Sequence, residues 1–169
     1  VKPYAEETPQ GSDILVYEYN EADKTATVVQ RQVWAQLDEY HGTMVNSYYG
    51  DIVIPEKVNG YTVTAIADFA FWKDYELGIS SVVIPKTVKN IGSFAFYNCN
   101  LLRELTIPAT VEYIGQQIIA GSGAQEVTIE DSDMPLTGYV ISPLLDSPHL
   151  TKIYAGRDIN LTNPETTYE

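Results

Sequence analysis

The clearest feature of the chain is a pattern of apolar positions that recurs at a fixed spacing. Ile84-Pro85 and Ile107-Pro108 open two segments of the same pattern, and the two isoleucines are 23 residues apart. A fixed period of this length is typical of a solenoid, in which each unit buries its apolar face only against its neighbours. The apolar positions of the two units are Val82, Ile84, Val88, Ile91, Ala95, Phe96, Cys99 and Leu102, followed by Leu105, Ile107, Val111, Ile114, Ile118 and Ile119.

Further units precede and follow this pair. Ile54-Pro55 opens an earlier unit that is longer because of insertions, one of which contains Asn59-Gly60 between β-branched and aromatic residues. Asn-Gly favours a tight turn, so we expect a protruding hairpin there. A fourth unit opens at Val127 without the proline, and residues 150–155 begin a fifth. The pattern predicts four to five turns.

Each unit should contribute one short strand to a parallel sheet. Leu105 and Ile107 share one face because side chains alternate along an extended chain. The following Pro108 has no N–H to donate, so it ends the ladder and turns the corner. We expect residues 93–98 to form a short helical or 3₁₀ segment on the convex side, and Phe71 and Phe96 to stack in the core.

The ends of the array need covers, because a terminal unit exposes apolar core. Residues 13–30 predict an N-terminal β-hairpin cap, with residues 31–51 as a connection whose Trp34 and Tyr40 pack partly against the core. The predicted organisation is a linker over 1–12, the cap and connection over 13–51, the repeat array over 52–155 and a tail over 156–169.

The string IP-x-x-V-x-x-I-G-x-x-A-F-x-x-C-x-x-L, intact from Ile84 to Leu102, closely resembles the leucine-rich repeat of the BspA type found in many bacterial surface proteins. The resemblance implies an α/β solenoid: a right-handed superhelix with parallel strands on its concave face and short helical segments on its convex face. It also implies export, with any signal segment removed, and a secreted or cell-surface role in adhesion or protein recognition. The fourth turn departs from the pattern because it lacks the proline and the glycine-aromatic segment.

Charge narrows the choice of partners. With 10 Lys plus Arg against 23 Asp plus Glu, the net charge is −13, which repels phosphate backbones and anionic headgroups. No apolar run approaches the roughly 18 residues of a membrane helix. We therefore expect neither nucleic-acid binding nor membrane insertion. The single cysteine, Cys99, occupies a repeat core position, where burial would raise its pKa.

The solvent-facing strand positions form the candidate ligand surface, and the expected ligand is a protein or, as a second choice, a glycan. The alternative is that these residues form an ordinary solvent-exposed sheet surface that binds no ligand. Thirteen tyrosines also suggest a binding surface, although strands and caps favour aromatics in any case. The predicted site residues are Val53, Val83, Thr106, Thr128 and Tyr154, flanked by Ser81, Glu104, Glu126 and Lys152.

Other chemistries have weaker support. The acidic stretch Glu130–Asp133 offers oxygen ligands for calcium, but its spacing is not that of an EF-hand loop. Asp146, Ser147 and His149 suggest a triad, yet no nucleophile elbow is present. We predict no enzyme activity and no cofactor. A structural spacer that self-associates through an array end is the alternative function, and a hydrolase ranks last.

Overall fold

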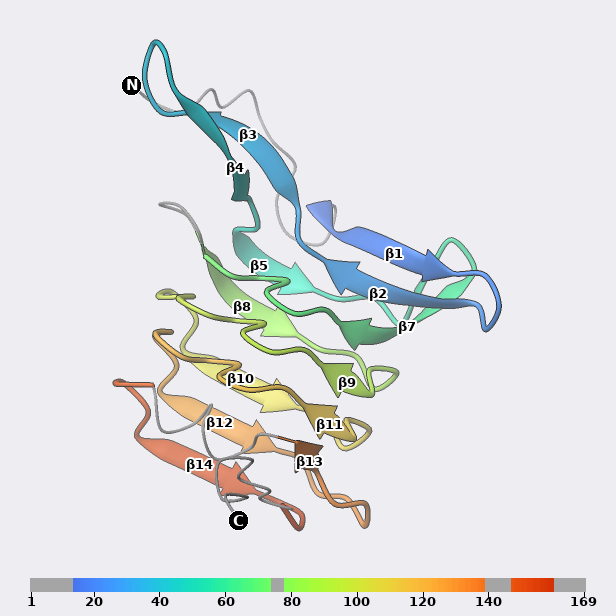
Figure 1. The fold of residues 1–169 in the computed structure, drawn as a ribbon. Coiled ribbons are helices and arrows are strands. Elements are labelled where there is room, and N and C mark those ends of the chain that lie inside the picture. The colour runs from blue at the N-terminus through green and yellow to red at the C-terminus, as the bar shows by residue number, and fades with distance from the viewer. Residues whose placement is uncertain (1–13, 74–77, 139–146, 160–169) are drawn as a thin grey trace, which may run out of the picture.

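The computed structural model describes residues 14–73, 78–138 and 147–159, which form a β-solenoid of about four turns. Each turn places one strand in each of two layers (Figure 1). The first layer contains β2 (Thr25–Val29), β7 (Tyr61–Ile66), β9 (Asn90–Ile91), β11 (Tyr113–Ile114) and β13 (Thr137–Gly138). The second contains β5 (Gly50–Val53), β8 (Ile79–Val83), β10 (Glu104–Ile107), β12 (Glu126–Ile129) and β14 (Lys152–Ala155).

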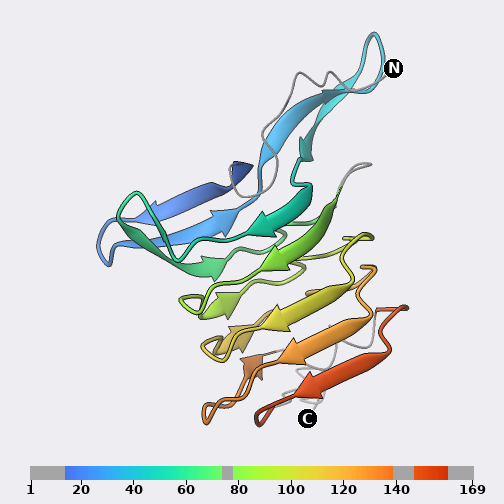
Figure 2. The ribbon, with the colours of Figure 1, turned by 180° about the vertical axis from the view of Figure 1, so that it is seen from behind.

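The strands of successive turns are parallel, as the repeat predicts. In the second layer, β10, β12 and β14 form one sheet, with Thr106 opposite Thr128 and Thr128 opposite Tyr154. β5 pairs in parallel with β8, which lies against β10 (Figure 2). The repeat period therefore fixes which residues of neighbouring turns lie side by side.

The predicted helical segments are wrong, and the fold is β rather than α/β. In an α-helix each N–H would bond to the carbonyl four residues earlier. Instead, the N–H of Phe94 donates to the carbonyl of Gln116 at 2.9 Å, and that of Phe96 to the carbonyl of Ile118 at 2.8 Å, both in the next turn. Phe69, Phe94 and Gln117, at equivalent positions, have φ of 56°, 57° and 51°. These left-handed residues prevent a continuous helix.

The core between the layers contains every apolar position predicted from the two clearest units. Phe71 and Phe96 stack with ring centroids 5.5 Å apart and an interplanar angle of 5°, which confirms the predicted ladder. Cys99 is fully buried beside them, and its thiol donates to the carbonyl of Phe71 at 3.0 Å. Each turn thus covers the apolar face of the next.

The predicted Asn59-Gly60 hairpin is present. β6 (Lys57–Val58) pairs antiparallel with the start of β7. Asn59 and Gly60 connect the two strands and have φ of 50° and 85°, respectively. Two successive positive φ values are those of a type I′ turn, whose twist matches the flanking strands. The hairpin projects from a corner of the solenoid, so the parallel pairing of β7 with β9 in the next turn continues past it.

The predicted N-terminal hairpin is also present. β1 (Val16–Asn20) pairs antiparallel with β2, and β2 continues the first layer by pairing with β7. Ala26 and Val28 of β2 are buried in the core. Buried Tyr48 holds the hairpin: its hydroxyl accepts from the Val16 N–H at 2.8 Å and donates to the Val29 carbonyl at 2.7 Å.

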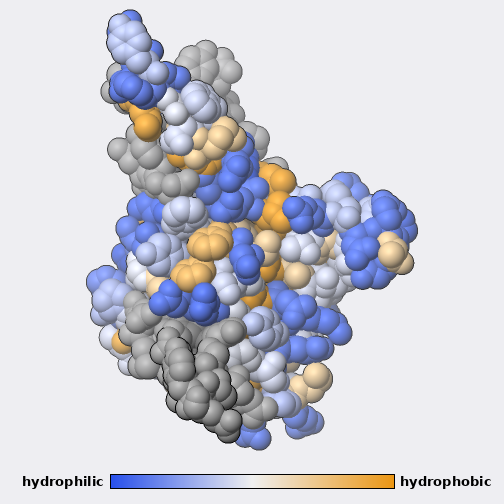
Figure 3. Space-filling model, viewed as in Figure 1, coloured by the Kyte–Doolittle hydropathy of each residue, from blue (hydrophilic) through white to orange (hydrophobic). Residues whose placement is uncertain are grey.

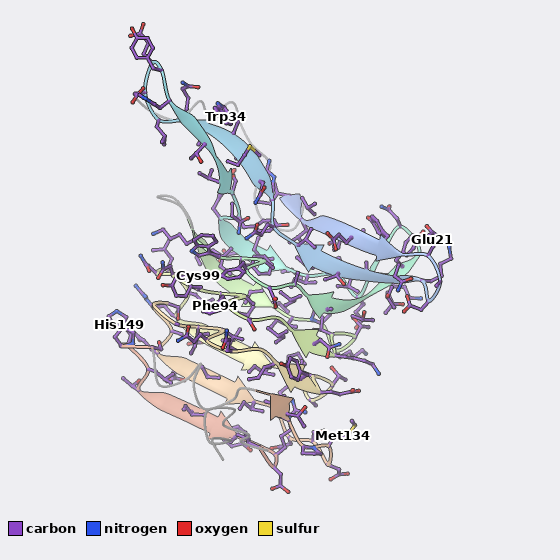
Figure 4. The ribbon with its side chains drawn as sticks, viewed as in Figure 1. Glu21, Trp34, Phe94, Cys99, Met134 and His149 are labelled. Carbon is purple, nitrogen blue, oxygen red and sulfur yellow. The ribbon has the colours of Figure 1, made fainter. Side chains whose placement is uncertain are left out.

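The connection departs from expectation, because β3 (Gln32–Gln36) and β4 (Gly42–Asn46) form an antiparallel arm that projects from the solenoid (Figure 1). Trp34 projects from the arm and is 63% exposed (Figure 4), and Tyr40 is 80% exposed, so neither packs on the core as predicted. The indole instead lies over Gly42 across the strand pair, in space that a Cβ at Gly42 would occupy. Local cross-strand packing replaces core packing at this position.

A buried arginine ties the C-terminal end to an earlier turn. The guanidinium of Arg157 donates to the carbonyls of Pro108 and Ala109, both at 3.0 Å. Burial lowers the pKa of this group, while the nearby charge of Glu130 opposes the shift. The predicted boundary between cap and array stays a prediction, and the predicted linker over 1–12 lies outside the described residues.

We predict that Phe96→Ala lowers the free energy of unfolding by about 3–5 kcal/mol, because it removes a fully buried ring from a stacked pair. Chemical denaturation monitored by circular dichroism measures the change. Val83→Ala is the matched control, since Val83 is 56% exposed on the same solenoid and should change stability by about 0.5 kcal/mol or less. Equal losses in the two variants would contradict a core built on the ladder.

Candidate functional site

The predicted site residues lie on strands β5, β8, β10, β12 and β14 of the second layer, which is in front in Figure 2. Their side chains alternate with buried core residues, and we call the outer side of this layer, which carries them, the strand face. Val53 and Val83 are direct cross-strand neighbours and are 53% and 56% exposed. Thr106, Thr128 and Tyr154 are in register with one another on the next three strands, with Thr128 half-buried and Tyr154 52% exposed. The strand face therefore carries a row that is aliphatic at one end and ends in a tyrosine.

A charged row runs beside it. Glu104 lies opposite Glu126, and Glu126 lies opposite Lys152, whose ammonium is 3.2 Å from the Glu126 carboxylate. At the other end, Ser81 faces Asp51, and hydroxyls of Ser80 and Ser81 donate to the Asp51 carboxylate at 3.0 and 2.7 Å. These hydrogen bonds lower the pKa of Asp51. The row is therefore predominantly acidic.

The acidic stretch after β12 is used for structure. A carboxylate oxygen of Glu130 accepts from the Ala109 N–H at 3.0 Å, and the hydroxyl of Tyr154 donates to Asp131 at 3.0 Å. That hydrogen bond and the charge of Asp131 raise the pKa of Tyr154. Within 14–73, 78–138 and 147–159, no cluster of His, Cys, Asp and Glu could hold a metal ion. The structure gives the calcium interpretation no support.

The residues of the triad hypothesis are not assembled in the described part of the chain. Buried Ser147 donates its hydroxyl to the Ala124 carbonyl at 3.4 Å, His149 is exposed at the surface (Figure 4), and Asp146 lies outside the described residues. The other imidazole, of His41, lies 2.8 Å from the Asp38 carboxylate near the end of the arm. None of these arrangements joins a nucleophile to a base.

Sequence reasoning missed a cleft at the N-terminal end of the solenoid. It is open, has a volume of about 580 Å³, and lies between β1 and the segment that joins β5 to the Asn59-Gly60 hairpin. Apolar surface is visible over the start of β1 in Figure 3. The alternation of Leu15, Tyr17 and Tyr19 was the available signal, because it places three large side chains on one face. Its lining is Leu15, Tyr17, Tyr19, Val53, Pro55 and Val58, with the Asn59 amide at one end.

The chain belongs to the BspA type leucine rich repeat family, which matches residues 51–141 in six copies and so covers more than half of the 169 residues. The family and fold are typically those of non-enzymatic protein-interaction scaffolds. No curated protein matches the chain. No helix among the described residues is long and apolar enough to cross a membrane.

Two crystal structures extend this comparison. A leucine-rich repeat protein from Bacteroides capillosus is 29% identical with a TM-score of 0.58, and the match covers 84% of this chain and 94% of that one. A leucine rich cell surface protein from Faecalibacterium prausnitzii is 23% identical with a TM-score of 0.50; the match covers 89% of this chain but 44% of that one. Both support the repeat solenoid as the fold.

We predict that stability falls as pH rises above about 9, because two buried groups hold their protons more tightly when folded. Burial raises the pKa of Cys99 from 9.0 to about 12 and that of Tyr48 from 10.0 to about 12. Below pH 9 the contribution is fully present. Between pH 9 and 12 the unfolded chain releases these protons and the folded chain keeps them, so the free energy of unfolding decreases.

Urea unfolding between about pH 8 and about pH 10.5 measures this decrease. In Cys99→Ala, the free energy of unfolding should fall less steeply with pH, since one of the two titrating groups is gone. A thiol reagent should also leave the native protein unmodified at about pH 8 and react once urea unfolds it. Rapid modification of the native thiol would contradict the assignment.

Proposed function

We propose that the chain is an extracellular or cell-surface recognition module that binds a protein partner through the strand face. The observation that carries this proposal is the aliphatic row of Val53 and Val83 beside an acidic row of Asp51, Glu104 and Glu126. Exposed aliphatic side chains in register form a contact area, and neighbouring carboxylates select the charge of the partner.

The family supports the class of function. BspA type repeats form protein-interaction scaffolds, and one structural relative is described as a cell surface protein. Surface or secreted localisation is accordingly part of the proposal, as is an adhesive role. A protein is favoured over a glycan because the strand face has aliphatic and carboxylate groups, whereas its only aromatic ring in the predicted row is that of Tyr154.

We predict that the double variant Thr106→Arg, Thr128→Arg abolishes partner binding, because two long cations at the centre of the row block contact. The purified chain is screened by surface plasmon resonance against a panel of extracellular-matrix proteins and, separately, on a glycan array. The charge-matched control is Asn90→Arg, Gln116→Arg, whose exposed side chains lie outside the strand face.

Binding that the first variant loses and the control keeps would support recognition through the strand face. Binding that both variants keep would contradict the use of this surface, and glycan binding without protein binding would replace the proposed ligand class. No binding to either panel at high micromolar concentration would favour the alternative function below.

The alternative is a spacer that assembles end to end, and one observation favours it. In the last strand, Ile153 is 46% exposed although it lies in register with fully buried Val127. An exposed position of the core ladder at the end of an array invites another surface to cover it.

If the chain assembles through this end, Ile153→Lys should convert the assembly to a monomer, because a charge would enter the covered position. Analytical ultracentrifugation over a concentration series measures the change, with Ile153→Val as the matched control. A chain that is monomeric at every concentration would exclude this alternative.

A further inference from the structure

Along the outer edge of β1, two residues have main-chain groups that pair with no other described residue. The N–H groups of Thr62 and Ala67 donate to the carbonyls of Lys24 and Val28, both at 2.9 Å, so the even-numbered residues of β2 face β7. Main-chain groups alternate in direction along a strand, so the odd-numbered residues of β2 face β1. They pair there with Val16, Glu18 and Asn20.

Tyr17 and Tyr19 must then direct their N–H and C=O groups to the opposite side of β1. Within the described part of the chain no hydrogen bond reaches these groups from that side, and β1 is the last strand of its sheet. Each of the two residues presents one donor and one acceptor. An edge of this kind is a template for one more strand.

The side chains of the same two tyrosines form one wall of the cleft. Their ring centroids are 6.2 Å apart, and the Tyr19 ring packs on Tyr61 with a centroid distance of 4.7 Å. The amide of Asn59 donates to the Tyr19 hydroxyl at 3.1 Å, which holds that ring against the hairpin. Open main-chain groups and an apolar cleft thus meet at the same two residues.

The charges around the edge determine which side chains suit the outward-facing positions of an added strand. Glu18 lies between the tyrosines and points to the other face of β1, where it is exposed. The nearby cation Lys24 is already bonded to Glu21 at 2.5 Å. Opposite charges on neighbouring strands attract, so basic side chains suit the positions beside Glu18.

We infer that β1 binds an extended segment of a protein partner as an additional strand, with apolar side chains of that segment in the cleft and basic side chains beside Glu18. Main-chain hydrogen bonds to Tyr17 and Tyr19 supply affinity, and the alternating side chains supply specificity. Val53 is the one residue of the cleft lining that also belongs to the strand face, and the edge residues Tyr17 and Tyr19 lie outside that face, so the inference stands whether or not the proposed function does.

The test uses a fluorescent, end-capped peptide of about ten residues that alternates valine and lysine, titrated with the intact chain and followed by anisotropy. The control peptide has the same side chains but carries an N-methyl group on every main-chain amide, so that neither of its edges can donate hydrogen bonds to β1. We expect methylation to weaken binding by at least about tenfold. Equal binding of the two peptides would overturn the proposal, because charge attraction alone would then explain it.

A matched pair of variants tests the edge from the side of the protein. Tyr19→Pro removes the outward N–H, and Tyr19→Val keeps it while removing the same ring. We expect the proline variant to bind the unmethylated peptide at least about fivefold more weakly than the valine variant. Equal affinity would overturn the assignment, and thermal unfolding of both variants checks that each is folded.

A third comparison separates this site from the strand face. The variant Thr106→Arg, Thr128→Arg should bind the peptide within about threefold of the unmodified chain, since both threonines lie away from β1. Loss of peptide binding in that variant would place the peptide on the strand face and overturn the inference.

Discussion

The structure depends on main-chain hydrogen bonds between turns. Within a turn, strands are short and left-handed residues interrupt the chain, so few main-chain groups can pair locally. They pair with the next turn, as Phe94 does with Gln116 and Phe96 with Ile118. A turn is therefore stable only against a neighbour, which is why the arrangement of both ends decides what the molecule can bind.

The two ends differ in how they meet this requirement. At the N-terminal end, Tyr48 joins β1 to β2 through one hydroxyl, and the hairpin lies over the core. This arrangement covers apolar residues but creates a new edge at β1. At the C-terminal end, Arg157 reaches back to the Pro108–Ala109 corner, while Ile153 stays exposed. One end thus offers main-chain groups to a partner and the other offers an apolar side chain.

Much of this fold could be predicted from the sequence because apolar residues that recur with the repeat period are those that the solenoid buries. Each apolar position between Val82 and Ile119 that recurs with the period is buried, and the Asn59-Gly60 dipeptide specifies its turn through local conformation alone. The row of Val53, Val83, Thr106, Thr128 and Tyr154 follows from the same alternation. Whether that row binds a ligand does not follow from periodicity.

The failures have a common physical cause. Residues 93–98 contain few turn formers, which favours a helix, but hydrogen bonds to the neighbouring turn override local preference. Trp34 was expected to pack partly against the core, yet Gly42 on the neighbouring strand provides an alternative contact. The cleft escaped notice because it joins residues 15–19 to residues 53–59. Each error concerns a contact between different segments of the chain, which the local pattern of residues does not reveal.

The Asn59-Gly60 hairpin has a practical consequence. It adds residues at a corner without disturbing the pairing of β7 with β9, and a Cβ built on Gly60 would meet no atom within 4 Å. A segment inserted at its tip would extend into solvent while both flanking strands keep their partners. The corner is therefore a natural position at which foreign epitopes or affinity tags could be displayed on a rigid, acidic carrier.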